Sequence, residues 1–273
     1  MNPVSAHAVN PQFPELLRGW RKIRKFSQLA LALNASISQR HLSFLESGRS
    51  SPSREMVLLL STSLELPFRE TNVLLNAAGY AHVFSESKLD HKVLKLANQA
   101  LTVMLKHHEP YGATVIDRNW NIQMMNEAAI RIFSLFVDPI SVWNDIGNKV
   151  PNTIRITLHP LGIRQYLVNW QEIAVYFIEQ LNKELVSNPF NHEATDLLNE
   201  IRNYPGMSDL VVVPHDLLRP VLPMILRKGE LELQFFTMVS TFGTPQDVTL
   251  QEIRIETLFP ADDATEQFVC ALS

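Results

Sequence analysis

The N-terminal quarter of the chain shows short apolar stripes separated by brief polar breaks, a pattern typical of small packed helices. The first stripe repeats at spacings of three and four residues, as one face of a helix does: Leu16, Leu17, Trp20 and Ile23. Three further helices would begin at serines, whose side chains can cap a first turn: Ser27, Ser38 and Ser53. A fifth helix is expected from about residue 69 to 78. The pattern predicts an all-α domain of five helices over residues 13–82, preceded by a flexible tail at residues 1–12.

The predicted third helix, SQRHLSFLES, is polar on the side that faces away from its buried stripe of Leu42 and Leu45. A turn of about three residues, 35–37, joins it to the second helix, and Gly48 is placed to end it in a left-handed conformation. Such a helix-turn-helix places its second helix in the major groove of DNA. Four outward side chains are therefore candidates for reading bases: Gln39, Arg40, Ser43 and Phe44.

The chemistry of these side chains suits base edges. Arg40 can bind guanine O6 and N7 through two hydrogen bonds, and Gln39 can bind adenine in the same manner. Phe44 can contact a thymine methyl group or pack against the neighbouring helix. Both alternatives for Phe44 stay open from the sequence.

Charge is distributed unevenly along the chain. Residues 1–82 hold nine Lys and Arg against five Asp and Glu, whereas residues 83–273 hold fifteen against twenty-three. A basic block at residues 18–25 beside an acidic remainder suggests that the N-terminal part meets a polyanion, although a solvated helix face would look the same. Contacts with DNA phosphates are expected from four residues: Gln28, Arg49, Arg21 and Lys25.

The remainder of the chain mixes strand and helix patterns. Residues 83–99 form a polar linker whose latter half has a helical pattern. The stretch GATVIDRNWNIQMMN predicts two short strands around a polar turn at residues 117–119. A helix is expected from about residue 127 to 136, and an apolar stripe from Trp170 to Leu185 predicts a longer one.

A β-hairpin is predicted near the C-terminus. The segments ELELQFFTMVSTF and VTLQEIRIETLF are joined by GTPQD, a five-residue connection. In the expected register Phe235 lies opposite Ile255, and Gln234 lies opposite Glu256. One face is then apolar and the other mostly polar, as for a sheet that covers a core on one side. The expected fold class is multidomain: the all-α domain followed by an α+β domain with an antiparallel sheet.

Composition narrows the function classes. No apolar run reaches the roughly 18 residues that a membrane helix needs. The start of the chain lacks the basic and apolar regions of a secretory signal, and a lone cysteine, Cys270, suits a reducing cytoplasm. Paired cysteines, a P-loop and the GxSxG and His-x-x-x-His motifs are missing from the sequence. We expect a cytoplasmic protein that is not an enzyme and uses no metal or other cofactor.

The segment SQLALALNASISQRHLSFLESGRSSPSREMVLLL makes residues 13–78 similar to an XRE-type (Cro-like) helix-turn-helix domain. Ser36 stands where that family usually has glycine in the turn. Serine can adopt the left-handed conformation at modest cost, so the resemblance holds. The family's helix-two glutamine and its base-reading positions correspond to Gln28, Gln39, Arg40 and Phe44.

The rest of the chain resembles the MmyB-like regulators. Three segments carry the resemblance: EPYGATVIDRNWNIQMMN, LHPLGIRQYLVNWQEIA and ELELQFFTMVSTFGTPQDVTLQEIRIETLFPADD. It implies a PAS-like ligand-binding domain over residues 100–265, followed by a short tail at residues 266–273. It also implies an apolar sensor pocket and a fatty-acid-like ligand.

Residues 115–240 supply thioethers and aromatic rings that can line an adaptable cavity or simply fill the core. Met125, Met207 and Met224 belong to this set. The expected pocket residues are Met124, Phe133, Phe136, His159, Arg164, Trp170, Phe235 and Met238. Within that group His159 and Arg164 are the candidates for holding a ligand carboxylate.

The expected function is a ligand-responsive transcription regulator. One recognition helix covers few base pairs, so a homodimer on palindromic double-stranded DNA is expected. The alternative is a DNA-binding protein whose C-terminal domain is a dimerisation or protein-interaction module without a small-molecule ligand. A sensor enzyme with a DNA-binding anchor is a third reading, from a different class.

Overall fold

The computed structural model describes residues 12–146, 150–210 and 220–272. The chain forms two compact units. The first comprises the residues up to Ser87 together with Pro245–Gln251, and the second comprises Lys88–Thr244 together with the residues from Glu252 onward. The tail predicted at residues 1–12 lies, apart from Gln12, outside the described residues.

The first unit contains the helices that the apolar stripes predict. They are α1 (Phe13–Ile23), α2 (Gln28–Asn34), α3 (Gln39–Glu46), α4 (Arg54–Ser63) and α5 (Phe68–Ala77). The three predicted serine caps are confirmed, because Ser27, Ser38 and Ser53 each accept a backbone hydrogen bond, at 3.0, 3.1 and 3.2 Å. Gly48 follows α3 with a φ of 70°, as predicted, and Ser36 adopts a φ of 52° although it carries a Cβ.

One apolar cluster holds this unit together. Leu42 and Leu45 of α3 are fully buried in it, beside Leu17 and Trp20 of α1 and Leu31 of α2. The stripe of α3 therefore faces the core as predicted. The opposite side of α3 is left for the polar residues that the sequence analysis singles out.

The second unit is an α+β domain built on one antiparallel sheet, which confirms the expected fold class. Its strands are β1 (Ala113–Ile116), β2 (Ile122–Met125), β3 (Met224–Lys228), β4 (Leu231–Thr241) and β5 (Arg254–Pro260). Their order across the sheet is β2-β1-β5-β4-β3. The helices before the sheet's last three strands are η1 (Lys92–Leu94), α6 (Lys95–His107), α7 (Glu127–Phe136), α8 (Pro139–Ile146), α9 (Thr153–Leu158), η2 (Ile163–Tyr166), α10 (Trp170–Ser187) and α11 (His192–Arg202).

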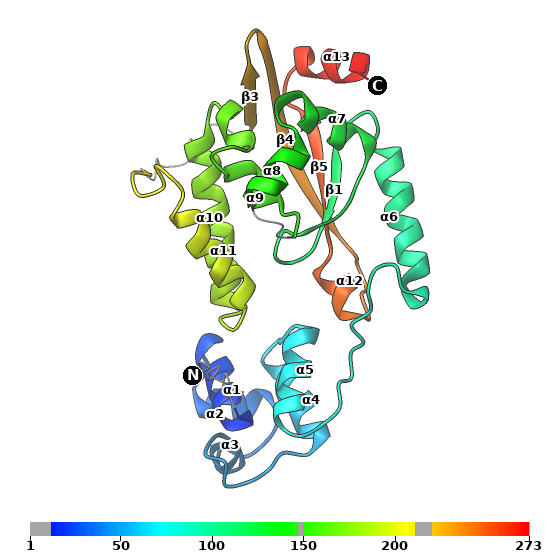
Figure 1. Cartoon of the computed structure of the whole chain (residues 1–273). Coiled ribbons are helices and arrows are strands. Elements are labelled where there is room, and N and C mark those ends of the chain that lie inside the picture. Colours follow the sequence, from blue (N-terminus) through cyan, green and yellow to red (C-terminus); the bar gives the residue numbers. More distant parts are fainter. Residues whose placement is uncertain (1–11, 147–149, 211–219, 273) are drawn as a thin grey trace, which may run out of the picture. The chain divides into compact units, whose positions relative to one another are not determined.

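Helices pack against both faces of the sheet, whereas the sequence pattern predicts a core on one side only. The main core joins α7, α9, α10 and α11 to sheet residues such as Leu233 and Phe235. A smaller cluster joins Leu101 and Leu105 of α6 to Val115 of β1 and its neighbours on the other face. In Figure 1 α10 and α11 run side by side, and α6 lies away from them, on the far side of β1.

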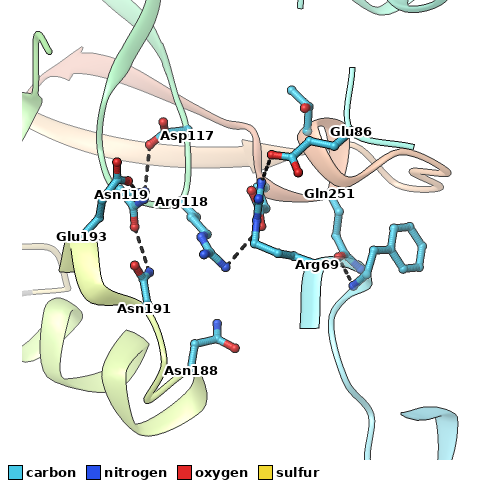
Figure 2. A network of polar contacts seen from close by, with 12 residues as sticks. Arg69, Glu86, Asp117, Arg118, Asn119, Asn188, Asn191, Glu193 and Gln251 are labelled. Atoms are coloured by element: carbon cyan, nitrogen blue, oxygen red, sulfur yellow. Dashed lines mark hydrogen bonds and ion pairs between the residues drawn. The ribbon is translucent and has the colours of Figure 1, made fainter. Parts of the chain in front are cut away.

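A polar network fixes the turn between β1 and β2. The Asp117 carboxylate accepts a hydrogen bond from the backbone N–H of Asn119 at 2.8 Å, as expected for a polar turn. The Asn119 side chain binds Glu193, and it accepts a hydrogen bond from Asn191 Nδ2 at 2.8 Å (Figure 2). Because Asn191 also caps α11 through Ala194 N–H at 3.1 Å, the network ties this turn to α11.

The predicted register of the C-terminal hairpin is wrong. Phe235 pairs with Pro260, and Val239 pairs with Glu256, so β5 lies five positions from the expected alignment. Residues expected to start the second strand instead form helix α12 (Val248–Glu252). Asp247 begins this helix by accepting a hydrogen bond from Thr249 N–H at 2.8 Å. The connection is therefore much longer than five residues.

The C-terminal segment also differs from expectation. Asp263–Leu272 form helix α13, where the sequence analysis expects a tail from residue 266. Asp262 caps the helix, since its Oδ1 accepts a hydrogen bond from Thr265 N–H at 2.7 Å. Val269 is buried in the main core, which explains why the segment is ordered as a helix.

Among the described residues, no helix is long and apolar enough to cross a membrane.

Candidate functional site

The outward face of α3 presents the four predicted base-reading residues together. Gln39 and Arg40 are exposed, and Ser43 and Phe44 are partly buried. The Arg40 guanidinium lies over the Phe44 ring, 5.4 Å from its centroid. A cation above an aromatic face is attracted by the ring's quadrupole, so Phe44 helps to orient Arg40. Phe44 does not belong to the apolar cluster of this unit in the part of the chain that the structure describes.

A buried carboxylate anchors α3 to the rest of the first unit. Glu46 is 2% exposed, and it accepts hydrogen bonds from Arg21 Nε at 2.5 Å and Arg21 Nη2 at 3.0 Å. Gln28 Nε2 donates to the same carboxylate at 2.8 Å, and Arg18 donates to the Glu46 carbonyl. A buried charge needs such partners, because an unpaired one would lose its hydration without compensation. Glu46 therefore fixes α3 relative to α1 and α2.

This anchor separates the four predicted phosphate-binding residues into two pairs. The Arg21 and Gln28 side chains are already engaged by Glu46, which gives both a structural contact. Lys25 and Arg49 are exposed. Glu46 is not among the residues predicted from the sequence, although it is the only acidic residue in α3 and lies next to the buried Leu45. Phosphate contacts by all four residues remain predictions.

An apolar cavity of about 610 Å³ opens over one face of the sheet in the second unit. Its floor includes Thr114, Met224, Phe235 and Leu258 from four different strands. Its walls come from α7, α9 and α10, through residues such as Phe133, Ile156 and Phe177. Cavities of a few hundred cubic ångströms with apolar walls and a few polar groups are typical of small-molecule sites.

Two of the eight predicted pocket residues, Phe133 and Phe235, line this cavity. The placement of Met124 is corrected, since it packs against the α6 side of the sheet with Leu101, while the adjacent Met125 lines the cavity. Successive strand residues point to opposite faces, so one position decides which side a methionine serves. Met238 is 54% exposed and does not line the cavity.

The other four predicted pocket residues also lie outside the cavity lining. Phe136 is buried in the main core, with its ring 5.7 Å from that of Tyr166. The Arg164 guanidinium stacks on Trp170, 3.8 Å from the ring centroid, and donates to the carbonyl of Pro205 at 2.6 Å. His159 packs edge-on against Tyr204. Arg164 and His159 are thus engaged elsewhere, so the structure does not place them where a ligand carboxylate in the cavity could reach them.

The polar groups of the cavity are ones that the sequence analysis does not select. Glu256 of β5 lines the cavity, as do Tyr176 of α10 and threonines such as Thr114. Burial raises the pKa of Glu256 to about 7, and the positive charge of Arg254 acts in the opposite direction. Burial also raises the pKa of Tyr176, and the nearby Glu256 charge adds to that increase. In the predicted register Glu256 falls on the solvent side of the hairpin, which is why it is missed.

Among the described residues, no group of three or more His, Cys, Asp or Glu side chains is placed to hold a metal ion. A chain that carries both a helix-turn-helix unit and a domain with an apolar cavity has the features of a DNA-binding transcription regulator with a ligand-binding domain. Residues 17–70 match the helix-turn-helix family, and residues 97–272 match the MmyB-like transcription regulator ligand binding domain. The second match covers more than half of the chain, which therefore belongs to the MmyB-like family.

Other comparisons add little. No curated protein matches the chain. A solved structure of an RNA-binding light-oxygen-voltage receptor is similar to it at 9% sequence identity, over 95% of this chain and 61% of the receptor. The chain thus spans less than two thirds of that receptor's length. The TM-score of 0.29 is too low for the similarity to support an argument.

Proposed function

We propose that this regulator binds a palindromic operator as a homodimer in the cytoplasm and senses a small apolar molecule with a fatty-acid-like chain. The observation that carries the proposal is the apolar cavity of about 610 Å³ in the ligand-binding domain. Apolar surface inside such a cavity favours an aliphatic chain, because water is released when the chain enters. The antiparallel sheet with helices against it supports the PAS-like description of the domain.

The DNA-binding part of the proposal rests on α3. Gln39 and Arg40 are exposed on the face that the anchor at Glu46 turns away from the core. Arg40 is assigned to guanine and Gln39 to adenine, with Ser43 and Phe44 beside them. Lys25 and Arg49, both exposed, are assigned to phosphates. Two copies of α3 related by a two-fold axis would read half-sites about 34–36 Å apart, or a multiple of that distance.

The path of the chain supports coupling between the cavity and the DNA-binding unit. Strands β4 and β5 both line the cavity, and the segment that joins them, Pro245–Gln251, belongs to the first unit. There Asp247 Oδ2 accepts a hydrogen bond from Ser85 Oγ at 2.8 Å, and Gln251 Oε1 accepts one from Phe68 N–H at 2.8 Å. Figure 2 shows Gln251 in this position. A ligand that alters the spacing of β4 and β5 would therefore act on a segment held by the helix-turn-helix unit.

One observation favours the alternative of an interaction module. Val93, Leu96 and Val103 lie along η1 and α6 and are 69%, 82% and 53% exposed. Exposed apolar residues in a row mark protein-binding surfaces. In our proposal this row packs against a second copy of the chain, which supplies the dimer. Leu96→Glu should then shift the protein from dimer to monomer in light scattering, whereas Lys95→Glu should not.

Mass spectrometry of the purified protein tests ligand sensing. Native and denaturing spectra of the same sample should differ by a co-purified apolar molecule, or aliphatic probes should raise the melting temperature of an empty protein. An empty protein whose melting temperature is unchanged by any aliphatic probe would favour the interaction module without a ligand. Turnover of such a probe, lost with a single substitution in the cavity, would instead favour the sensor enzyme.

A further inference from the structure

Glu256 is the one charged side chain among the described residues that line the cavity. It lies near the middle of the sheet, where it is paired with Thr114 of β1 on one side and Val239 of β4 on the other. Between described residues, its carboxylate makes no hydrogen bond and no ion pair. The Glu256 carboxylate thus borders an apolar space without a hydrogen-bond donor for its oxygens among these residues. It favours a ligand that brings such a donor or a positive charge.

The neighbouring side chains that the structure describes do not supply a partner for the Glu256 carboxylate. Arg254 of the same strand lies outside the lining, with its guanidinium 5.3 Å from the Trp120 ring centroid and 4.0 Å from Glu184 Oε2. Tyr176 of α10 also lines the cavity, and burial together with the nearby Glu256 charge raises its pKa, so it is present as a neutral hydroxyl. The positive charge of Arg254 thus lowers the free energy needed to ionise Glu256, although the two side chains form no ion pair.

We propose that the cavity selects an apolar molecule whose head group donates hydrogen bonds or carries a positive charge, such as an alkyl amine or alcohol, over an alkyl carboxylate. This inference rests on the proposed sensing of an aliphatic ligand and names its head group. A carboxylate head beside Glu256 would place two like charges in a site with little water, whereas an ammonium would pair with it. An alcohol would donate one hydrogen bond to the same oxygens.

Three probes of equal chain length separate the head group from the tail: dodecylamine, dodecanol and dodecanoate. Each is titrated below its micelle concentration into the full-length protein at pH 8.5, where Glu256 is ionised, with tryptophan fluorescence or calorimetry as the readout. Dodecylamine should bind at least about tenfold more tightly than dodecanoate. Glu256→Gln keeps the size of the side chain and removes its charge, so it should bring the two affinities at least about tenfold closer together.

The matched control is Glu230→Gln, which removes an exposed carboxylate outside the cavity lining and should leave the ranking unchanged. If dodecanoate binds as tightly as dodecylamine to the wild-type protein, the head-group inference is overturned while ligand sensing stands. If Glu256→Gln and Glu230→Gln have the same effect on the ranking, the role of Glu256 is overturned. If none of the three probes binds, the proposed aliphatic sensing fails, and this inference fails with it.

A pH comparison on the wild-type protein keeps the inference testable if Glu256→Gln does not fold. Dodecanoate is mostly ionised and dodecylamine is protonated at both pH 6 and pH 8.5, because a carboxyl group titrates at about pH 4–5 and an alkyl amine at about pH 10. Glu256, with a pKa of about 7, loses its proton between these values. Dodecanoate should bind more weakly at pH 8.5 than at pH 6, dodecylamine should bind more tightly, and dodecanol should change least. Tighter binding of dodecanoate and weaker binding of dodecylamine at pH 8.5, or no change of either affinity with pH, would contradict the assignment.

Discussion

The two candidate sites differ in how far apart along the chain their residues lie. The outward face of α3 belongs to a single helix, Gln39–Glu46, whose start and orientation follow from one serine cap and one leucine stripe. The cavity collects residues from Thr114 to Leu258, so it depends on strand register and on which helix packs where. Apolar spacing therefore locates a site on one helix well, whereas a cavity depends on long-range contacts that this spacing does not specify.

The largest expected effect is a loss of stability when the Glu46 anchor that holds α3 against α1 and α2 is removed. Glu46→Ala should lower the free energy of unfolding of the first unit by about 3–5 kcal/mol, because it leaves the Arg21 guanidinium without its buried partner. Denaturant titration followed by circular dichroism measures the loss. Glu15→Ala removes an exposed carboxylate from α1 and should cost less than about 1 kcal/mol. Equal losses in the two variants would show that the Glu46 anchor contributes nothing special.

The next largest effect concerns base reading. Arg40→Ala should weaken binding to the preferred duplex, selected from randomised DNA, by about 1–3 kcal/mol and relax the base preference at one position. Lys25→Ala serves as the control, because loss of a phosphate contact should weaken all sequences alike and flatten the salt dependence. An Arg40→Ala protein with wild-type affinity and selectivity would mean that α3 does not read bases as assigned.

A pair of methionines sharpens the comparison at the cavity. Met224 lines it, whereas Met238 was expected to do so and is exposed instead. Met224→Ala should weaken dodecanol binding by about 1–2 kcal/mol, because apolar contact with the aliphatic chain is lost. Met238→Ala should leave the affinity unchanged. Calorimetric titration of both variants decides the point, and an effect of Met238→Ala equal to that of Met224→Ala would place the ligand elsewhere.

The smallest expected effect lies in the turn before α3. Ser36 adopts a φ of 52°, a conformation that glycine reaches without a steric penalty. Ser36→Gly should therefore raise the free energy of unfolding by about 0.5–1 kcal/mol, measured by denaturant titration. Ser47→Gly, next to a glycine already in the left-handed conformation, should not stabilise the protein in the same way. A destabilised Ser36→Gly protein would show that the turn is held by the serine itself.

Particular residues show where sequence reasoning succeeds and where it stops. The caps at Ser27, Ser38 and Ser53 and the strands around Asp117 were predictable, because each depends on neighbours within a few positions. Glu256 was not, because a shift of the hairpin register moves it from the solvent face to the cavity. The shift follows from helix α12, whose cap at Asp247 interrupts a stretch with a plausible strand pattern.

The same physical reason explains the misplaced pocket residues. Aromatic and thioether side chains suit a cavity wall and a packed core equally well, so composition alone could not separate Phe133 from Phe136. Arg164 looked available for a ligand carboxylate, yet it stacks on Trp170, six positions further along the chain. Only the packing of Arg164 against Trp170 of α10 and the Pro205 carbonyl after α11 reveals where its guanidinium lies.

The central claim is that a molecule in the cavity controls binding of DNA by the helix-turn-helix unit. Fluorescence anisotropy of a labelled preferred duplex, titrated with the full-length protein with and without saturating dodecanol, tests it most directly. Dodecanol is neutral and does not compete for phosphates. We expect the Kd for the duplex to change by about fivefold or more when the cavity is filled. The same Kd with the cavity empty and saturated would contradict it.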